Sequence, residues 1–225
     1  MDTLKPSDAL ATSDIVDAGL ADWRKLAQRL HARFRTGNAA VGAAFIADAV
    51  RAAGGASLTD HMDATLTPTS VDLRVATTGN GVWVTADDIT LARLLSEVAQ
   101  GHDVTSVPGE VTQVELALDT SDDARLGPFW AAVLTGNADG VVSDTVFDPT
   151  RQLPSLWFQG TEPHKEPRQR WHLDLWVAPE VAGDRIAAGV AAGGTVVDDS
   201  EAPSFTVLAD PEGNKVCICT HLDRA

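Results

Sequence analysis

Apolar and polar residues alternate along several segments of the chain, and this pattern predicts strands with one buried face. Residues 23–36 alternate in this way, as do residues 71–75. Between them, residues 39–53 are small and apolar at helical spacing, and Gly54-Gly55 ends the pattern. The sequence therefore predicts a hairpin arm, a helix and a second strand, in that order.

A second helix follows this strand. Gly79-Asn80-Gly81 is typical of a turn, and Thr85 precedes Asp88 by three residues, which is the spacing of a capping box. The helix that this box opens runs over 88–100 and has a broad apolar face. The first part of the chain is thus expected to be an α+β domain of β-β-α-β-β-α order.

The second half repeats one order of elements twice. The sequence predicts strands at 111–119, 141–147, 155–159, 171–177, 195–198, 204–209 and 215–220, with helices at 121–135 and 179–192. Grouped in chain order, these elements form two β-α-β-β-β units.

The 225 residues of the chain suit two domains of about 100 residues each. We expect a loose leader over 1–13, a first domain over 14–100, a linker over 101–109 that contains a Pro-Gly pair, and a second domain over 110–225.

The chain is acidic, with a net charge of −15 that lies mostly in its second half. Such a charge repels nucleic-acid phosphate and anionic membranes, so neither is expected as a partner. No apolar run reaches the roughly 18 residues that span a bilayer, and the first residues lack a signal-peptide core. We expect a cytoplasmic protein in which Cys217 and Cys219 stay reduced.

The second half resembles the glyoxalase-like branch of the vicinal-oxygen-chelate superfamily. The resemblance rests on four segments that occur in the family's order: Phe129-Trp130-Ala131-Ala132-Val133-Leu134, Leu156-Trp157-Phe158-Gln159, Trp171-His172-Leu173-Asp174 and Ala209-Asp210-Pro211-Glu212-Gly213-Asn214. It implies a curled sheet whose concave face can hold a small molecule.

This resemblance places the family's metal-ligand positions at Gln113, Gln159, His172 and Cys217. Two amides, one imidazole and one thiol suit neither a hard cation nor zinc well. We therefore expect no required cofactor, and we favour His172 as a hydrogen-bonded cavity residue and the cysteines as small core fillers. Gln113, Gln159 and His172 are the candidate residues for binding a small molecule, and a divalent metal on the four residues is the alternative.

The first half resembles pterin-4a-carbinolamine dehydratase over roughly residues 14–100. Trp23, the strand through Phe34, Thr59-Asp60-His61-Met62-Asp63 and Gly81-Val82-Trp83-Val84-Thr85-Ala86-Asp87-Asp88 carry the resemblance. The family removes water from a 4a-hydroxytetrahydropterin with histidines as general acid and base, a role that suits imidazole near neutral pH.

The chain departs from the family's histidine pattern. Asp60-His61-Met62 stands where the family has His-His-Pro, and the third histidine position falls at Thr78 or Gly79. The resemblance leaves His61 as the catalytic acid or base, oriented by Asp60 or Asp88. The alternative makes His61 a solvated loop residue, Asp60 a turn former and Asp88 only a capping carboxylate.

Trp83 and His31 each have two interpretations. Trp83 is either core packing or an aromatic wall for a planar, pterin-like ligand. His31 lies between arginines on the polar face of its strand, where solvation is the first expectation and contact with an acidic neighbour the second.

Three functions are open at this point. The first is a carbinolamine dehydratase-like lyase that acts on a tetrahydrobiopterin-type heterocycle and is fused to a glyoxalase-like domain. The second is a non-catalytic small-molecule-binding protein with two degenerate pockets. The third is a metal-dependent lyase or dioxygenase centred on His172. Both resembled families imply a homodimer.

Overall fold

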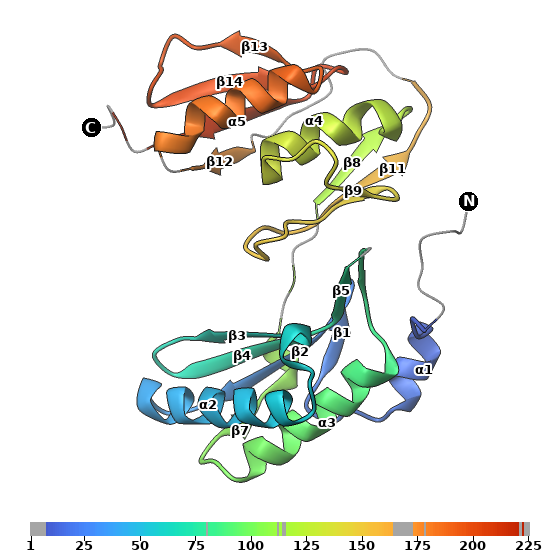
Figure 1. The fold of residues 1–225 in the computed structure, drawn as a ribbon, viewed down its shortest axis with the longest axis vertical. Coiled ribbons are helices and arrows are strands. Elements are labelled where there is room, and N and C mark those ends of the chain that lie inside the picture. The colour runs from blue at the N-terminus through green and yellow to red at the C-terminus, as the bar shows by residue number, and fades with distance from the viewer. Residues whose placement is uncertain are drawn as a thin grey trace. The chain divides into compact units, whose positions relative to one another are not determined.

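Buried apolar residues gather in two separate clusters, one in each half of the chain. The chain accordingly divides into two compact units, Met1–Gln113 and Val114–Ala225, whose elements Figure 1 labels. The structure is a computed structural model that describes residues 8–79, 81–111, 113, 116–163, 173–177, 179–220 and 222. Each unit has its own hydrophobic core, which is the physical mark of a domain.

The first unit is a mixed α+β structure. Its elements are α1 (Thr12–Asp17), β1 (Arg24–Leu26), β2 (Arg29–Arg35), α2 (Ala39–Gly55), η1 (Thr59–His61), β3 (Met62–Leu66), β4 (Ser70–Val75), β5 (Thr77–Gly79), β6 (Gly81–Trp83), α3 (Ala86–Gln100), β7 (Thr105–Ser106) and η2 (Pro108–Glu110). The predicted helices and the strand at 71–75 occur, whereas the segment 23–36, predicted as one hairpin arm, forms both arms, β1 and β2.

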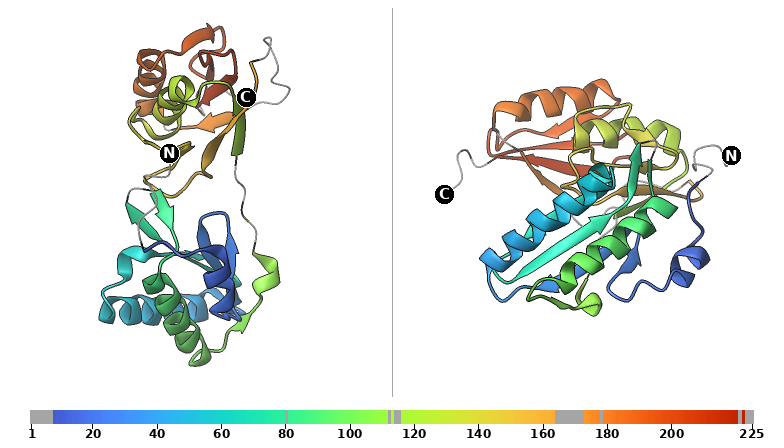
Figure 2. Two further views of the ribbon diagram at one scale, coloured as in Figure 1. Left: turned by 90° about the vertical axis from the view of Figure 1, so that its right-hand side faces the viewer. Right: turned by 60° about the horizontal axis from the view of Figure 1, so that its bottom comes forward.

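An antiparallel sheet of order β1-β2-β4-β3 supports this unit. Helices α2 and α3 lie side by side along one face of it, as the two figures of the whole chain show (Figures 1 and 2). The alternation seen in the sequence decides which side chains face these helices: Leu30, Ala32 and Phe34 of β2 are buried in the core. The charged residues between them therefore lie on the sheet's other face.

Residues 101–109, predicted as a linker, instead belong to the first unit. Strand β7 pairs with Phe34 and Arg35 at the edge of β2, and η2 packs beside the same strand. The Pro-Gly pair that suggested a linker forms this short 3-10 turn. The predicted leader is also partly wrong, because Leu10 packs against the core and its N–H donates to the carbonyl of Val84.

The second unit has two sheets, each with its own helix. Its elements are β8 (Leu116–Thr120), α4 (Asp123–Thr135), β9 (Val141–Val142), β10 (Thr145–Val146), β11 (Leu156–Gly160), β12 (Asp174–Trp176), α5 (Pro179–Ala191), β13 (Thr195–Asp198), β14 (Phe205–Ala209) and β15 (Lys215–Cys219). The sheets have the orders β8-β11-β10-β9 and β12-β15-β14-β13. In both, the first strand runs parallel to the last, and the other pairings are antiparallel.

Two predicted strands of this unit differ from the structure. The strand expected at 111–119 begins only at Leu116, since Val111 and Gln113 lie against the sheet of the first unit. The single strand expected at 141–147 is a tight hairpin of β9 and β10. Ser143, with a φ of 58°, reverses the chain between them.

A buried carboxylate, that of Asp210, fixes the turn between β14 and β15. Its Oδ1 accepts the backbone N–H groups of Glu212 and Asn214, both at 2.8 Å. Its Oδ2 accepts the Asn214 side chain at 2.8 Å and the Trp130 indole N–H of α4 at 3.0 Å. The Asp-Pro-Glu-Gly-Asn segment therefore forms the turn between β14 and β15, and its aspartate links this turn to α4. Pro211 and Gly213 supply the backbone angles of the turn.

The two helices of this unit also contact each other. Arg185 of α5 donates to the carbonyl oxygens of Val133 and Leu134 at the end of α4, at 2.6 and 2.7 Å. A cation at the carboxyl end of a helix satisfies carbonyl groups that lack intrahelical partners. Arg185 thus acts as a C-terminal cap supplied by the neighbouring helix.

Within the described residues, no helix combines the length and apolar character needed to cross a bilayer.

The Asp210 carboxylate generates a stability prediction. Asp210→Ala removes the acceptor of four hydrogen bonds, so we expect the free energy of unfolding of the second unit to fall by about 2–4 kcal/mol. Trp130→Phe removes a single donor while keeping most of the ring volume, so the expected loss is about 1 kcal/mol. Denaturant unfolding of the full chain measures both values.

Asp139→Ala is the matched control, because Asp139 is an exposed residue of the loop after α4. We expect a change within about 0.5 kcal/mol for it. Equal losses for Asp210→Ala and Asp139→Ala would show that the Asp210 network does not stabilise the unit.

Candidate functional site

His61 is held where three elements of the first unit meet. It is the last residue of η1, just before β3, and its carbonyl accepts the N–H of Ala76 at 3.0 Å. Its ring Nδ1 lies 2.8 Å from Oδ1 of Asp88, the third residue of α3. The His61 side chain is 22% exposed, whereas that of Asp88 is fully buried. The pair therefore combines a partly exposed histidine with a buried aspartate.

The other oxygen of Asp88 receives four donors. Thr85 donates to Oδ2 through its backbone N–H at 2.7 Å and its hydroxyl at 3.0 Å. Thr77 of β5 donates to the same atom through its N–H at 3.0 Å and its hydroxyl at 2.9 Å. The predicted capping box is thus present, but its carboxylate also ties the start of α3 to the hairpin and to His61.

This arrangement decides which ring nitrogen of His61 carries the proton. A carboxylate oxygen accepts hydrogen bonds, so the Nδ1–H group donates to Asp88. The Nε2 atom then has the free lone pair. A buried carboxylate that holds a histidine in this tautomer is a recurrent device of general acid–base sites.

Thr77 is a site residue that the sequence analysis missed. Its hydroxyl lies 2.9 Å from Asp88 Oδ2 and 3.3 Å from His61 Nδ1. The position comes directly after the buried end of β4 and Ala76, and nothing in the local pattern distinguishes this threonine from its neighbour Thr78. The fold of the hairpin is what brings it to the pair.

Trp83 lies on the same hairpin. It is the cross-strand partner of Thr77 in the β5–β6 pair, and directly opposite residues of an antiparallel pair point to the same face. The half-buried indole packs over Gly81, where an added methyl group would come within 2.8 Å of Trp83 Nε1. Trp83 and Thr77 therefore share the face of the hairpin that meets His61.

Asp60 is an exposed residue of η1. Of the two carboxylates proposed to orient His61, that of Asp88 is the one observed 2.8 Å from the ring.

Three of the four residues predicted to bind a ligand or metal in the second half are among the described residues. Gln113 closes the first unit, Gln159 is exposed on β11, and Cys217 is buried on β15. His172 lies outside the described residues. The described residues contain no group of three or more His, Cys, Asp or Glu side chains that could hold a metal ion. Two amides, one imidazole and one thiol suit a divalent cation poorly, so we derive no chemistry through one.

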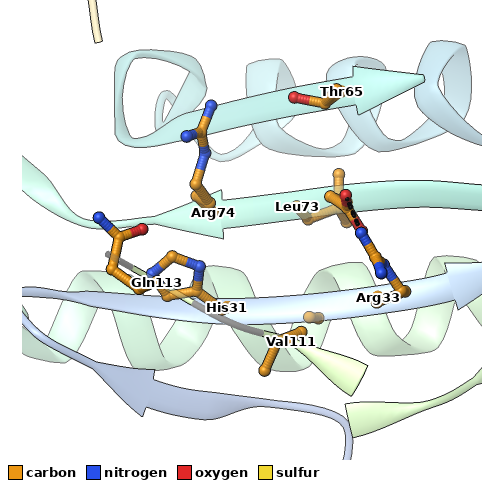
Figure 3. A pocket seen from close by; sticks show the side chains of 9 residues that line it. His31, Arg33, Thr65, Leu73, Arg74, Val111 and Gln113 are labelled. Carbon is orange, nitrogen blue, oxygen red and sulfur yellow. Dashed lines mark hydrogen bonds and ion pairs between the residues drawn. The ribbon is translucent and has the colours of Figure 1, made fainter. Parts of the chain in front are cut away.

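A separate cavity of about 130 Å³ lies on the face of the first sheet that α2 and α3 leave uncovered (Figure 3). The side chains of His31, Arg33, Thr65, Asp72, Arg74, Val111 and Gln113 line it. His31 was predicted to be solvated, but it is 5% exposed. Arg74, Val111 and Gln113 line the same cavity as its ring, an arrangement that the alternation of β2 alone did not reveal.

Burial and nearby cations change the titration of His31. Desolvation, followed by the charges of Arg74 and Arg29, lowers its pKa from 6.5 to about 4, although Asp72 partly opposes this shift. Within the described residues, its buried Nε2 has no hydrogen-bond partner. His31 is therefore a neutral, buried imidazole beside arginines.

Residues 115–219 match a family described as "Glyoxalase-like domain", so the second unit is a glyoxalase-like domain of the vicinal-oxygen-chelate type. Among solved structures, the chain is similar to a transcriptional coactivator/pterin dehydratase from Brucella melitensis, with 25% identity, coverage of 40% of this chain and 98% of that chain, and a TM-score of 0.36. It is also similar to a glyoxalase/bleomycin resistance protein from Albidiferax ferrireducens T118, with 20% identity, coverage of 47% and 95%, and a TM-score of 0.37. The comparison with curated proteins gives no match.

Asp88 generates the first prediction from this geometry. Asp88→Ala removes the acceptor shared by α3, β5 and His61, so the free energy of unfolding of the first unit should fall by about 2–4 kcal/mol. Asp87→Ala, at the exposed neighbouring position, should change it by only a few tenths of a kcal/mol. Similar losses for both variants in denaturant unfolding would contradict the assigned role.

His31 generates the second prediction. Because its folded pKa is about 4 and its unfolded value 6.5, the unfolded chain binds more protons between these pH values. The contribution of His31 to the free energy of unfolding is therefore fully present above pH 6.5. It declines as the pH falls towards 4, by roughly 3 kcal/mol in total, and declines no further below pH 4.

His31→Gln should remove this part of the pH dependence. The measurement is the difference between the unfolding free energies of wild type and variant at intervals from pH 7 to pH 4. Parallel curves for the two proteins would contradict the lowered pKa.

Proposed function

We propose that the first unit is a hydro-lyase of the pterin carbinolamine dehydratase type, with His61 as its catalytic acid–base residue. The observation that carries this proposal is the His61–Asp88 pair, in which a buried carboxylate 2.8 Å from Nδ1 leaves Nε2 of a partly exposed ring to exchange protons. The motifs around Asp60 and Trp83, which resemble that family, support the same reaction class.

The chemistry requires one proton carrier. In a carbinolamine, a hydroxyl and a nitrogen share one carbon. Nε2 of His61 takes the N–H proton as the nitrogen's electron pair forms the C=N bond and the C–O bond breaks. The imidazolium, stabilised by the Asp88 carboxylate, then gives that proton to the departing hydroxide, so that water leaves and the histidine is restored.

Trp83 supplies the second element of the proposal. Its indole shares a hairpin face with Thr77, whose hydroxyl lies 3.3 Å from His61 Nδ1. An aromatic ring in this place offers a stacking surface for a planar bicyclic heterocycle. Trp83 is therefore proposed to orient a pterin-like substrate rather than to take part in proton transfer.

The glyoxalase-like unit is proposed to be a small-molecule-binding domain without a required metal. Gln159, exposed on β11, is its candidate ligand contact, and His172 is a second candidate on sequence grounds alone. A non-catalytic protein that binds ligands in both units is the competing function. The unfavourable metal-ligand set in the second half is the observation that favours it.

The decisive measurement is dehydration of a 4a-hydroxytetrahydropterin by the full chain, followed by the change in ultraviolet absorbance as the C=N bond forms. We expect the wild type to exceed the uncatalysed rate and His61→Ala to lose about 10²–10⁴ of the enzymatic rate. Because the His61 side chain is partly exposed, the variant should stay folded. Trp83→Ala should raise KM more than it lowers kcat.

Asp87→Ala is the control, since this exposed residue of α3 precedes Asp88 but makes no part of the proposed site. It should keep the wild-type rate. Pterin binding without any rate above background, in wild type and His61→Ala alike, would overturn the lyase and favour the binding protein.

A further inference from the structure

The uncovered face of the first sheet carries an excess of arginine. Three of its arginines are held by carboxylates in the ion pairs Arg29–Asp63, Arg33–Asp72 and Arg35–Glu110. Arg33 and Asp72, the second of these pairs, both line the cavity; Figure 3 marks the Arg33 ion pair with a dashed line. These pairs engage the carboxylates of Asp63, Asp72 and Glu110 with other arginines.

Arg74 is a further cation on this face. It lies on β4 directly opposite His31 of β2 and Asp63 of β3. Among the described residues, no ion pair holds its guanidinium: Asp63 is paired with Arg29 and Asp72 with Arg33. In Figure 3 the Arg74 side chain reaches from β4 towards β3. A guanidinium presents several donors in one plane, the geometry that carboxylate and phosphate oxygens match.

His31 adds a second polar group that lacks a partner. Its ring lines the same cavity, and its buried Nε2 has no hydrogen-bond partner among the described residues. A buried polar atom in this state costs about 1–3 kcal/mol relative to a bonded one. An incoming acceptor that reached the ring would relieve that penalty, whereas a second cation would add to the charge of Arg74.

The cavity limits the size of an occupant. Its volume of about 130 Å³ has room for a tetrahedral phosphate or a carboxylate group. The Thr65 hydroxyl and the Gln113 amide also line the cavity and can donate hydrogen bonds.

We propose that this cavity is a binding site for a small oxyanion, a phosphate or carboxylate group, held mainly by Arg74 and His31. The site uses a face of the sheet that α2 and α3 do not cover, and it shares no residue with the His61–Asp88 pair. The ligand is either a free anion or the anionic end of a small metabolite. The chain's net charge of −15 repels anions in general, so saturable binding of one would have to come from a local site.

Titration calorimetry of the full chain with inorganic phosphate, and separately with acetate, tests the site at constant ionic strength. We expect saturable binding of one anion per chain at millimolar concentrations or below. Arg74→Gln should weaken it at least tenfold, Arg74→Lys should weaken it less, and His31→Gln should weaken it severalfold. Tighter binding of phosphate or of acetate identifies which of the two groups the site prefers.

Arg51→Gln is the matched control, because Arg51 is an exposed arginine of α2 that pairs with Asp48. It should bind phosphate as the wild type does. The proposal is overturned if the wild type shows no saturable binding of either anion up to about 10 mM, or if Arg74→Gln, shown to be folded by circular dichroism, binds like Arg51→Gln.

Discussion

The buried carboxylate of Asp88 is the constraint on which the candidate site of the first unit depends. Four donors from Thr77 and Thr85 converge on one of its oxygens, and His61 contacts the other. Removing a carboxylate from water is unfavourable unless its oxygens are satisfied in this way. The start of α3, the β5–β6 hairpin and the turn before β3 are therefore positioned together, although they are separate in sequence.

This shared dependence links folding to the proposed chemistry. A capping carboxylate ordinarily satisfies N–H groups at one helix end. Here the same group also sets the tautomer of a partly exposed histidine. Structural and functional explanations of Asp88, which the sequence alone presents as alternatives, are thus compatible in one side chain.

Local patterns predicted the elements well where one rule dominated. The alternation in β2 and β4 and the capping box before α3 were all read correctly because each reflects contacts within a few residues or a single buried face. The prediction was wrong where contacts between segments distant in sequence determine strand pairing or burial. Short-range signals show neither the pairing of β7 with β2 nor the burial of His31.

The candidate site shows the same division. His61 and Asp88 were selected from the residues that resemble a known family, and their proximity is a product of the fold. Thr77 was missed because a threonine after a strand has no distinguishing pattern. Arg74 was missed because its significance depends on which neighbouring carboxylates are already engaged, and that requires coordinates.

The place of β7 has a consequence for dividing the chain. Strands β1 and β7 occupy successive stretches of the same edge of β2, at Arg29–His31 and at Phe34–Arg35. A fragment ending at residue 100 would leave the backbone N–H and C=O groups at the end of β2 without partners and would remove the carboxylate of Glu110 from Arg35. Bare edges of this kind recruit strands from other molecules. A fragment that keeps the first unit intact therefore extends through Gln113.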